Sequence, residues 1–243
     1  MQIGLIGLQN SGKTTLFSAL TNTEITPELQ AKTDLNRSVV KVPDKRLDKL
    51  TAMFNPKKQV YATLEIVDIP GLQVSDDGKV KITSDFLNKV KNNDALLHVV
   101  REFQNDAVPH PEITVNPLRD IEFLETEFLL NDMTMIENRL EKIQKDILKS
   151  KTDQLQKELP LFKKMQEHIE KELPLRLLKL DENEKKVIAG YQFLTIKPLI
   201  IGINFSEDSK DKSDGLIAEI EMKYSEHGLR IVPFFASFEY ELS

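Results

Sequence analysis

The chain has 243 residues, a formal net charge of −6 and no cysteine. A chain of this length predicts one or two domains with a buried core, and the missing cysteines exclude disulfides and thiolate metal sites. The negative charge argues against strong intrinsic binding to nucleic acid. There is no apolar stretch of membrane-span length and no sign of a signal peptide, so we expect a cytoplasmic protein without a membrane partner.

Residues 7–14 read Gly-Leu-Gln-Asn-Ser-Gly-Lys-Thr and fit the phosphate-binding pattern G-x-x-x-x-G-K-[ST]. The apolar residues 3–6 before it predict a buried strand, and residues 14–20 after it predict a helix, which is the context that a P-loop requires. Glycine lets the backbone wrap around phosphate oxygens, and the helix N-terminus adds its dipole. A chance glycine-rich turn is the alternative. The residues predicted to contact the nucleotide here are Asn10, Ser11, Gly12, Lys13, Thr14 and Thr15.

Two of these side chains have predicted chemical roles. Lys13 is expected to reach the β- and γ-phosphates and to act in catalysis, and the Thr14 hydroxyl is expected to bind Mg²⁺. Asn10 is a candidate to hold K⁺ beside the phosphates through its side-chain carbonyl. The alternative is that Asn10 only shapes the loop.

The next segments predict the two switch regions of a nucleotide hydrolase. Residues 23–38 are polar without clear periodicity. Within this segment, Thr33 is the candidate to contact Mg²⁺ and the γ-phosphate. The alternative is that Thr33 is a plain loop threonine. A short strand at 39–42 and a helix opening at Pro43 precede a second strand at 61–67. That strand ends in Asp68-Ile-Pro-Gly71. We predict that Asp68 holds the Mg²⁺ shell and that the Gly71 N–H approaches the γ-phosphate.

The residue after that glycine is Leu72, where many GTPases have a glutamine that orients the attacking water. Leucine cannot do this, and Gln73 would point the opposite way on an extended backbone. A further buried strand at 95–100 contains His98, which we interpret as a satisfied core histidine. His110 lies beyond that strand between two prolines, and it is either an exposed titratable histidine or a plain loop residue.

From 118 to 180 the apolar residues follow a three/four alternation, broken at 149–153. This predicts two long helices folded as an antiparallel hairpin, the second kinked or interrupted at Pro160 and Pro174. The charged faces are either solvated surface or a partner-binding arm. A helix at 181–191, a strand at 197–203, a helix at 213–224 and a strand at 228–235 follow. The predicted fold is an α/β three-layer P-loop NTPase sheet formed by residues 1–117 and 181–243, with the hairpin 118–180 inserted.

The chain resembles the Obg-like ATPase family of YchF type. The resemblance rests on residues 7–17, 42–48, 66–72, 98–101, 117–122 and 191–198, and on Asn204-Phe-Ser-Glu207. It implies a G-domain that hydrolyses ATP at least as readily as GTP, with Leu72 in place of the catalytic glutamine and His110 as its suspected substitute. It also implies association with the ribosome and a base-binding loop at Phe235 and Ala236.

The chain departs from the family pattern in three places. The glycine-rich second switch is reduced to a single glycine within 73–79, and the Ser-Ala base loop reads Phe235-Ala236. The third departure is the TGS domain of the family, which we expect to be absent because the sequence stops at Ser243. We also expect the last helix of the sheet to be missing.

Two functions are compatible with these motifs. The first is a switch that slowly hydrolyses ATP, or GTP, with Mg²⁺. The second is a nucleotide-binding interaction module with negligible hydrolysis. Glu207 carries its carboxylate one methylene further out than the guanine-binding aspartate, so adenine is expected to be accepted. Asn204 is a candidate acceptor for the adenine amino group, and the Phe205 ring is a candidate to stack on either purine.

Overall fold

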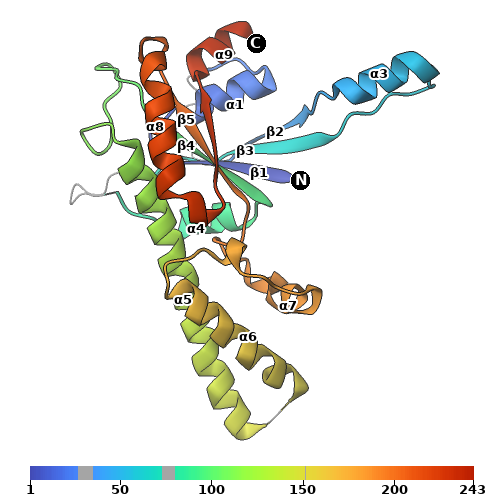
Figure 1. The fold of residues 1–243 in the computed structure, drawn as a ribbon, viewed down its shortest axis with the longest axis vertical. Coiled ribbons are helices and arrows are strands. Elements are labelled where there is room, and N and C mark those ends of the chain that lie inside the picture. The colour runs from blue at the N-terminus through green and yellow to red at the C-terminus, as the bar shows by residue number, and fades with distance from the viewer. Residues whose placement is uncertain (27–34, 73–79, 151) are drawn as a thin grey trace.

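The structure, a computed structural model, describes residues 1–26, 35–72, 80–150 and 152–243, without the side chains of 208 and 210–212. Its centre is a six-stranded sheet in the order β2-β3-β1-β4-β5-β6, in which β2 is antiparallel to β3 and the other neighbours are parallel (Figure 1). The predicted α/β fold is confirmed. The strands are β1 (Gln2–Ile6), β2 (Asn36–Lys41), β3 (Thr63–Asp68), β4 (Ala95–Arg101), β5 (Leu199–Asn204) and β6 (Arg230–Phe234).

Helices cover both faces of the sheet. The main core joins the strands to α4 (Ser84–Lys91), α5 (Pro117–Lys149) and α8 (Lys210–Lys223). On the other face, Phe17 of α1 (Lys13–Thr21) packs against Leu5 and Ile66. A further helix, α9 (Ala236–Leu242), contacts α1, so the expectation that the last helix is missing was wrong. After β6 ends at Phe234, the chain forms this helix of seven residues, which packs against α1.

A helical hairpin extends away from the sheet. It consists of α5 and α6 (Asp153–Ile169), and the side-chain oxygens of Asn116 and Thr152 cap the two helix starts (Figure 1). Of the predicted kink or interruption at Pro160, the structure excludes the interruption, because α6 continues through this residue. Both Pro160 and Gln156 are exposed, so the carbonyl that loses its partner can bind water. The helix ends at Ile169, and the chain continues into a 3₁₀ turn, η1 (Leu175–Leu177).

The hairpin has its own apolar core. Ile136 and Phe162 pack there with Phe193, beside α7 (Glu182–Ile188) and η2 (Ala189–Tyr191). The first turns of α5, by contrast, bury Ile121 in the core of the sheet. The apolar contacts of the hairpin therefore extend past residue 180, and the start of α5 is anchored in the core of the sheet.

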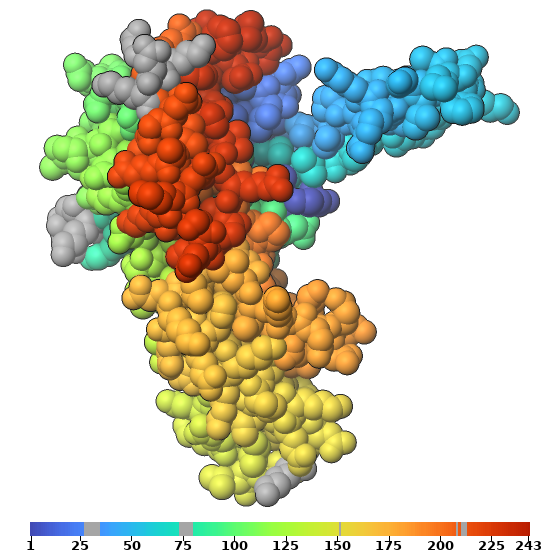
Figure 2. Space-filling model, viewed as in Figure 1, coloured from blue at the N-terminus to red at the C-terminus, as the bar shows by residue number. Residues whose placement is uncertain are grey.

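A second projection carries α3 (Lys45–Phe54) at the end of the β2–β3 pair (Figure 2). None of its residues is buried, and Leu50, Met53 and Phe54 are exposed. The remaining short turns are η3 (Glu207–Ser209) and η4 (Ser225–His227). Among the helices described, none combines the length and apolar character needed to cross a membrane.

Candidate nucleotide site

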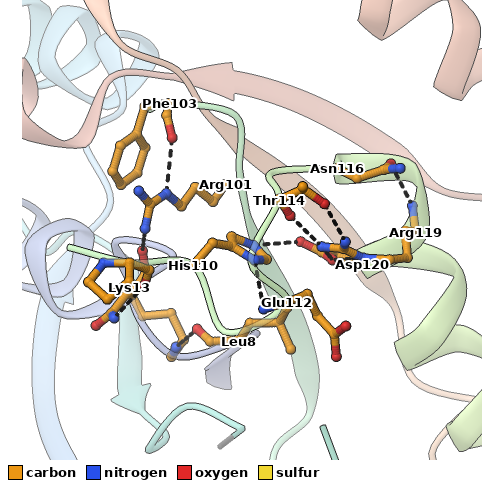
Figure 3. Close-up of polar contacts among 12 residues, drawn as sticks. Leu8, Lys13, Arg101, Phe103, His110, Glu112, Thr114, Asn116, Arg119 and Asp120 are labelled. Carbon is orange, nitrogen blue, oxygen red and sulfur yellow. Dashed lines mark hydrogen bonds and ion pairs between the residues drawn. The ribbon is translucent and has the colours of Figure 1, made fainter. Parts of the chain in front are cut away.

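The P-loop joins the end of β1 to α1, where Lys13 is the first helical residue. The Lys13 side chain is buried, and its Nζ donates to the carbonyls of Leu8 at 2.7 Å and Gly7 at 3.3 Å (Figure 3). Burial lowers the pKa of Lys13 to about 8, while the nearby Asp68 carboxylate acts in the opposite direction. The loop thus curls around its own lysine, and a bound phosphate would compete for the same ammonium group.

Gly12 permits this curl. Its φ of +97° lies in the left-handed region, and a Cβ at this position would lie 2.2 Å from Nδ2 of Asn204. Ser11 is also buried, and its hydroxyl has no hydrogen-bond partner among the residues that the structure describes. An orphaned hydroxyl in a phosphate-binding loop is a donor that phosphate oxygens can satisfy.

Two of the predicted metal ligands, Thr14 and Asp68, lie in the part of the chain that the structure describes. They meet at the carboxyl ends of the strands. Thr14 Oγ1 donates to Asp68 Oδ2 at 2.9 Å, and the Asp68 carboxylate is largely buried at the end of β3. Burial raises the pKa of Asp68, although Thr14 and Lys13 favour its charged form. A hydroxyl and a buried carboxylate fit the oxygen preference of Mg²⁺. Thr33 lies outside the described residues.

Mg²⁺ would take its remaining ligands from phosphates and water. In the described part of the chain, no group of three or more His, Cys, Asp or Glu side chains is placed to hold a metal ion. Mg²⁺ commonly binds through one or two protein oxygens and the phosphates of its substrate.

The turn after Asp68 lies directly against the P-loop. A Cβ on Gly71 would lie 2.7 Å from Lys13 Nζ and 2.8 Å from Gln9 N, so this position has room only for glycine. The Leu72 N–H donates to the Gly7 carbonyl at 3.2 Å, and the Gln9 N–H donates to the Leu72 carbonyl at 3.0 Å. The Leu72 side chain is 3% exposed and belongs to the core. Leu72 therefore joins the two nucleotide motifs through its backbone.

Asn204, at the end of β5, joins the P-loop to the predicted base loop. Its Nδ2 donates to the Ser11 carbonyl at 3.1 Å, and its Oδ1 accepts the Ala236 N–H at 3.0 Å. The asparagine is almost completely buried. Its role as a tie between distant loops was missed because Ser11 and Asn204 are 193 positions apart in the sequence, so no local pattern reveals the contact.

Phe205 does not lie where it was expected. Its ring is 3% exposed within the main core and packs against Phe235, with the ring centroids 6.2 Å apart. The expectation that it stacks on a purine is wrong for this structure, because the apolar ring is held inside. Glu207 is exposed on η3 and Ala236 is buried.

A loop between β4 and α5 covers the side of the P-loop (Figure 3). The Asn10 side chain donates to the Pro109 carbonyl at 3.0 Å. Arg101, a buried residue that sequence reasoning did not assign to the site, donates to the carbonyls of Phe103 at 3.0 Å and Asn10 at 3.4 Å. A charged residue ending an apolar strand was the available signal.

Two histidines differ from their sequence interpretation. The side chain of His110 is only 2% exposed, so the interpretation as an exposed histidine was wrong, and burial lowers its pKa. His98 is buried as predicted but not satisfied, because its Nδ1 finds no hydrogen-bond partner within the described residues. Burial lowers the pKa of His98 to about 3, against the influence of Glu125.

Known proteins resemble the whole chain. The family described as 50S ribosome-binding GTPase matches residues 2–204. An Obg-like ATPase 1 from Oryza sativa subsp. indica is 32% identical over 243 residues, covering 98% of this chain and 62% of its own length. The ribosome-binding ATPase YchF of Bacillus subtilis (strain 168) is 33% identical over 244 residues, covering 99% of this chain and 66% of its own length.

A solved structure shares the fold across the full chain. The YchF GTPase of Schizosaccharomyces pombe superposes with a TM-score of 0.78 at 26% identity, covering 100% of this chain and 67% of its own. The present chain spans less than two thirds of the length of the two curated relatives.

Proposed function

The chain belongs to the 50S ribosome-binding GTPase family, and we propose that it binds a purine nucleoside triphosphate with Mg²⁺ and hydrolyses it slowly as a molecular switch. The observation that carries the proposal is the meeting of two motifs at one edge of the sheet. Lys13 and Thr14 of the P-loop and Asp68 and Gly71 of the turn after β3 come from separate segments, yet they lie within contact distance.

The chemistry follows from these positions. The Lys13 ammonium and the P-loop amides stabilise negative charge on the phosphoryl group. Thr14 and Asp68 would hold Mg²⁺, which when bound neutralises charge on the phosphate oxygens. Leu72 offers no proton or hydrogen bond from its side chain, so backbone groups of the neighbouring turn orient water. His110, in the loop beside the P-loop, is the side chain that assists, and its contacts with Asp120 and Glu112 set the orientation of its ring.

Replacing Lys13 tests the site directly. We expect Lys13→Ala to lower the single-turnover rate of Mg²⁺–ATP hydrolysis by roughly a hundredfold or more, the size of a lost charge-stabilising contact. Lys49→Ala, which removes an exposed lysine of α3, is the matched control and should keep the rate. Unchanged turnover and affinity in Lys13→Ala would overturn the assignment of the P-loop.

The alternative is a nucleotide-binding module with negligible hydrolysis. Its support is the absent glutamine at Leu72 and the reduced second switch. The relatives are named ATPases, which favours hydrolysis. Single-turnover assays of the unaltered chain distinguish the two, because the module would bind nucleotide with no product formed.

We propose ATP as the preferred nucleotide, with GTP accepted. Glu207, on the η3 turn that follows β5, is exposed and one methylene too long for the bidentate contact that guanine requires. The side-chain amide of Asn204 is already hydrogen-bonded to the Ser11 and Ala236 backbones, so few polar groups of the site are left to discriminate between adenine and guanine.

We propose K⁺ as a further cofactor, held through Asn10. A hydrolysis rate that is unchanged when Na⁺ replaces K⁺ would exclude it.

We propose the ribosome as a macromolecular partner and the cytoplasm as the location. The relatives include proteins named ribosome-binding ATPase. The α5–α6 hairpin supplies a long exposed arm for such a contact, and sedimentation with 50S subunits, with and without the arm tip at 140–160, tests it.

A further inference from the structure

We propose that Asp120 is a positioning residue for nucleotide hydrolysis, because it holds His110 and thereby fastens the loop beside the P-loop to the arm helix α5. The inference rests on the proposed hydrolysis and adds a residue that lies outside the P-loop and outside the Asp68–Gly71 turn. It also gives the helical arm a physical connection to the nucleotide site.

The hydrogen bonds of His110 define which nitrogen of its ring carries the proton. Nδ1 accepts the Glu112 N–H at 3.1 Å, so this nitrogen carries no proton. The other nitrogen, Nε2, lies 3.1 Å from Asp120 Oδ2 and therefore donates its proton to that carboxylate. The ring is held as one neutral tautomer, and the two side chains are 2% and 3% exposed. Without Asp120, nothing in these contacts fixes the orientation of the ring at Nε2.

Asp120 is itself firmly held. Its Oδ1 accepts from Arg119 Nε at 2.9 Å and from Nη2 at 2.7 Å. Arg119 also donates to the Thr114 carbonyl at 2.9 Å, which closes the end of the loop. Asp120 lies in the first turn of α5, where the helix dipole favours a carboxylate. The arm helix therefore presents a fixed, charged acceptor to His110 (Figure 3).

The other end of the loop touches the P-loop. Pro109, the residue before His110, accepts the Asn10 amide at 3.0 Å, and Arg101 donates to the Asn10 carbonyl at 3.4 Å. A continuous path of contacts thus runs from Asn10 through residues 109–110 to Asp120. A displacement of α5 moves Asp120, and with it the loop that borders the phosphates.

A double-mutant cycle tests the proposal. We expect Asp120→Ala to lower kcat by about tenfold or more, within the range of a mispositioned acid–base group, with KM changed by less than about threefold. In the double variant with His110→Ala, kcat should be within about threefold of His110→Ala alone, because both changes remove the same arrangement. Asp106→Ala, an exposed aspartate of the same loop, is the control and should retain full activity.

Two further measurements keep the test sharp. Asp120→Asn retains an oxygen for the Nε2 proton and should keep more turnover than Asp120→Ala. In ¹⁵N spectra of the imidazole, the unaltered chain should show His110 as a single Nε2–H tautomer, and Asp120→Ala should show a mixture.

The outcomes separate this inference from the proposed function. Additive losses in the cycle, or an unchanged kcat and tautomer in Asp120→Ala, would overturn the positioning role. If the unaltered chain hydrolyses no nucleotide, the proposed function fails and with it the kinetic role of Asp120. The tautomer spectra would still decide whether Asp120 positions His110.

Discussion

His98 is a buried base in the middle of β4, and its protonation must oppose folding. Its pKa is lowered to about 3, whereas an unfolded histidine titrates near 6.5. Between these values the unfolded chain binds a proton that the folded chain does not, so the free energy of unfolding falls as the pH falls. From pH 7 to pH 5 we expect a loss of about 2 kcal/mol from this residue.

Urea unfolding at several pH values measures this loss. His98→Gln cannot titrate and should lack this part of the slope, about 1.4 kcal/mol per pH unit. Equal slopes for the two proteins would show that His98 binds protons to the same extent in the folded and unfolded states, against the lowered pKa.

At the residue scale, variants of Leu72 distinguish a role in core packing from a role in the chemistry of hydrolysis. Its side chain is 3% exposed in the core, so Leu72→Ala should cost about 2–4 kcal/mol of unfolding free energy. Turnover per folded molecule should change by less than about tenfold, because leucine contributes no proton. Leu72→Met, which keeps the volume, is the control, and the two variants are compared by denaturant unfolding and single turnover. A hundredfold loss of rate with unchanged stability would contradict this view.

The hairpin is held at its root by a buried aspartate, and this is an element-scale property. Asp132 of α5 is fully buried and accepts the N–H groups of Leu194 at 3.0 Å and Thr195 at 2.7 Å, together with the Thr195 hydroxyl at 2.8 Å. Asp132→Ala leaves these buried donors unpaired. We expect a loss of about 3 kcal/mol in the free energy of unfolding.

Amide exchange locates that loss. The Leu194 and Thr195 amides should exchange faster in Asp132→Ala, because the root of the arm opens. Asp132→Asn keeps one acceptor and should lose less. An unchanged exchange rate at both amides would refute the role of Asp132 as the anchor of the arm.

At the scale of the whole molecule, nucleotide binding should raise the free energy of unfolding. A ligand at a hundred times its Kd adds about 2.7 kcal/mol to the free energy of unfolding. We expect this from Mg²⁺ with a non-hydrolysable ATP analogue, and a smaller gain from the GTP analogue at the same concentration. Thermal unfolding measures both, and Lys13→Ala serves as the control without binding. A larger gain from the GTP analogue would reverse the proposed base preference.

Local patterns in the sequence determined the P-loop, the Asp68–Gly71 turn, the α/β fold and the helical hairpin. Each of these depends on spacing within a few residues: glycine where the backbone must curl, apolar runs for parallel strands, and a three/four alternation for amphipathic helices. These features were predictable because backbone geometry and burial act over one element at a time.

Only the tertiary structure decided the environment of individual side chains. Phe205 follows an apolar strand and His110 lies between prolines, yet both are buried in the folded chain. The same holds for Asn204, whose partners are Ser11 and Ala236, and for α9, which packs against α1. The physical reason is that burial and hydrogen-bond partners depend on which segments pack together in the folded chain, and local sequence patterns do not specify those contacts.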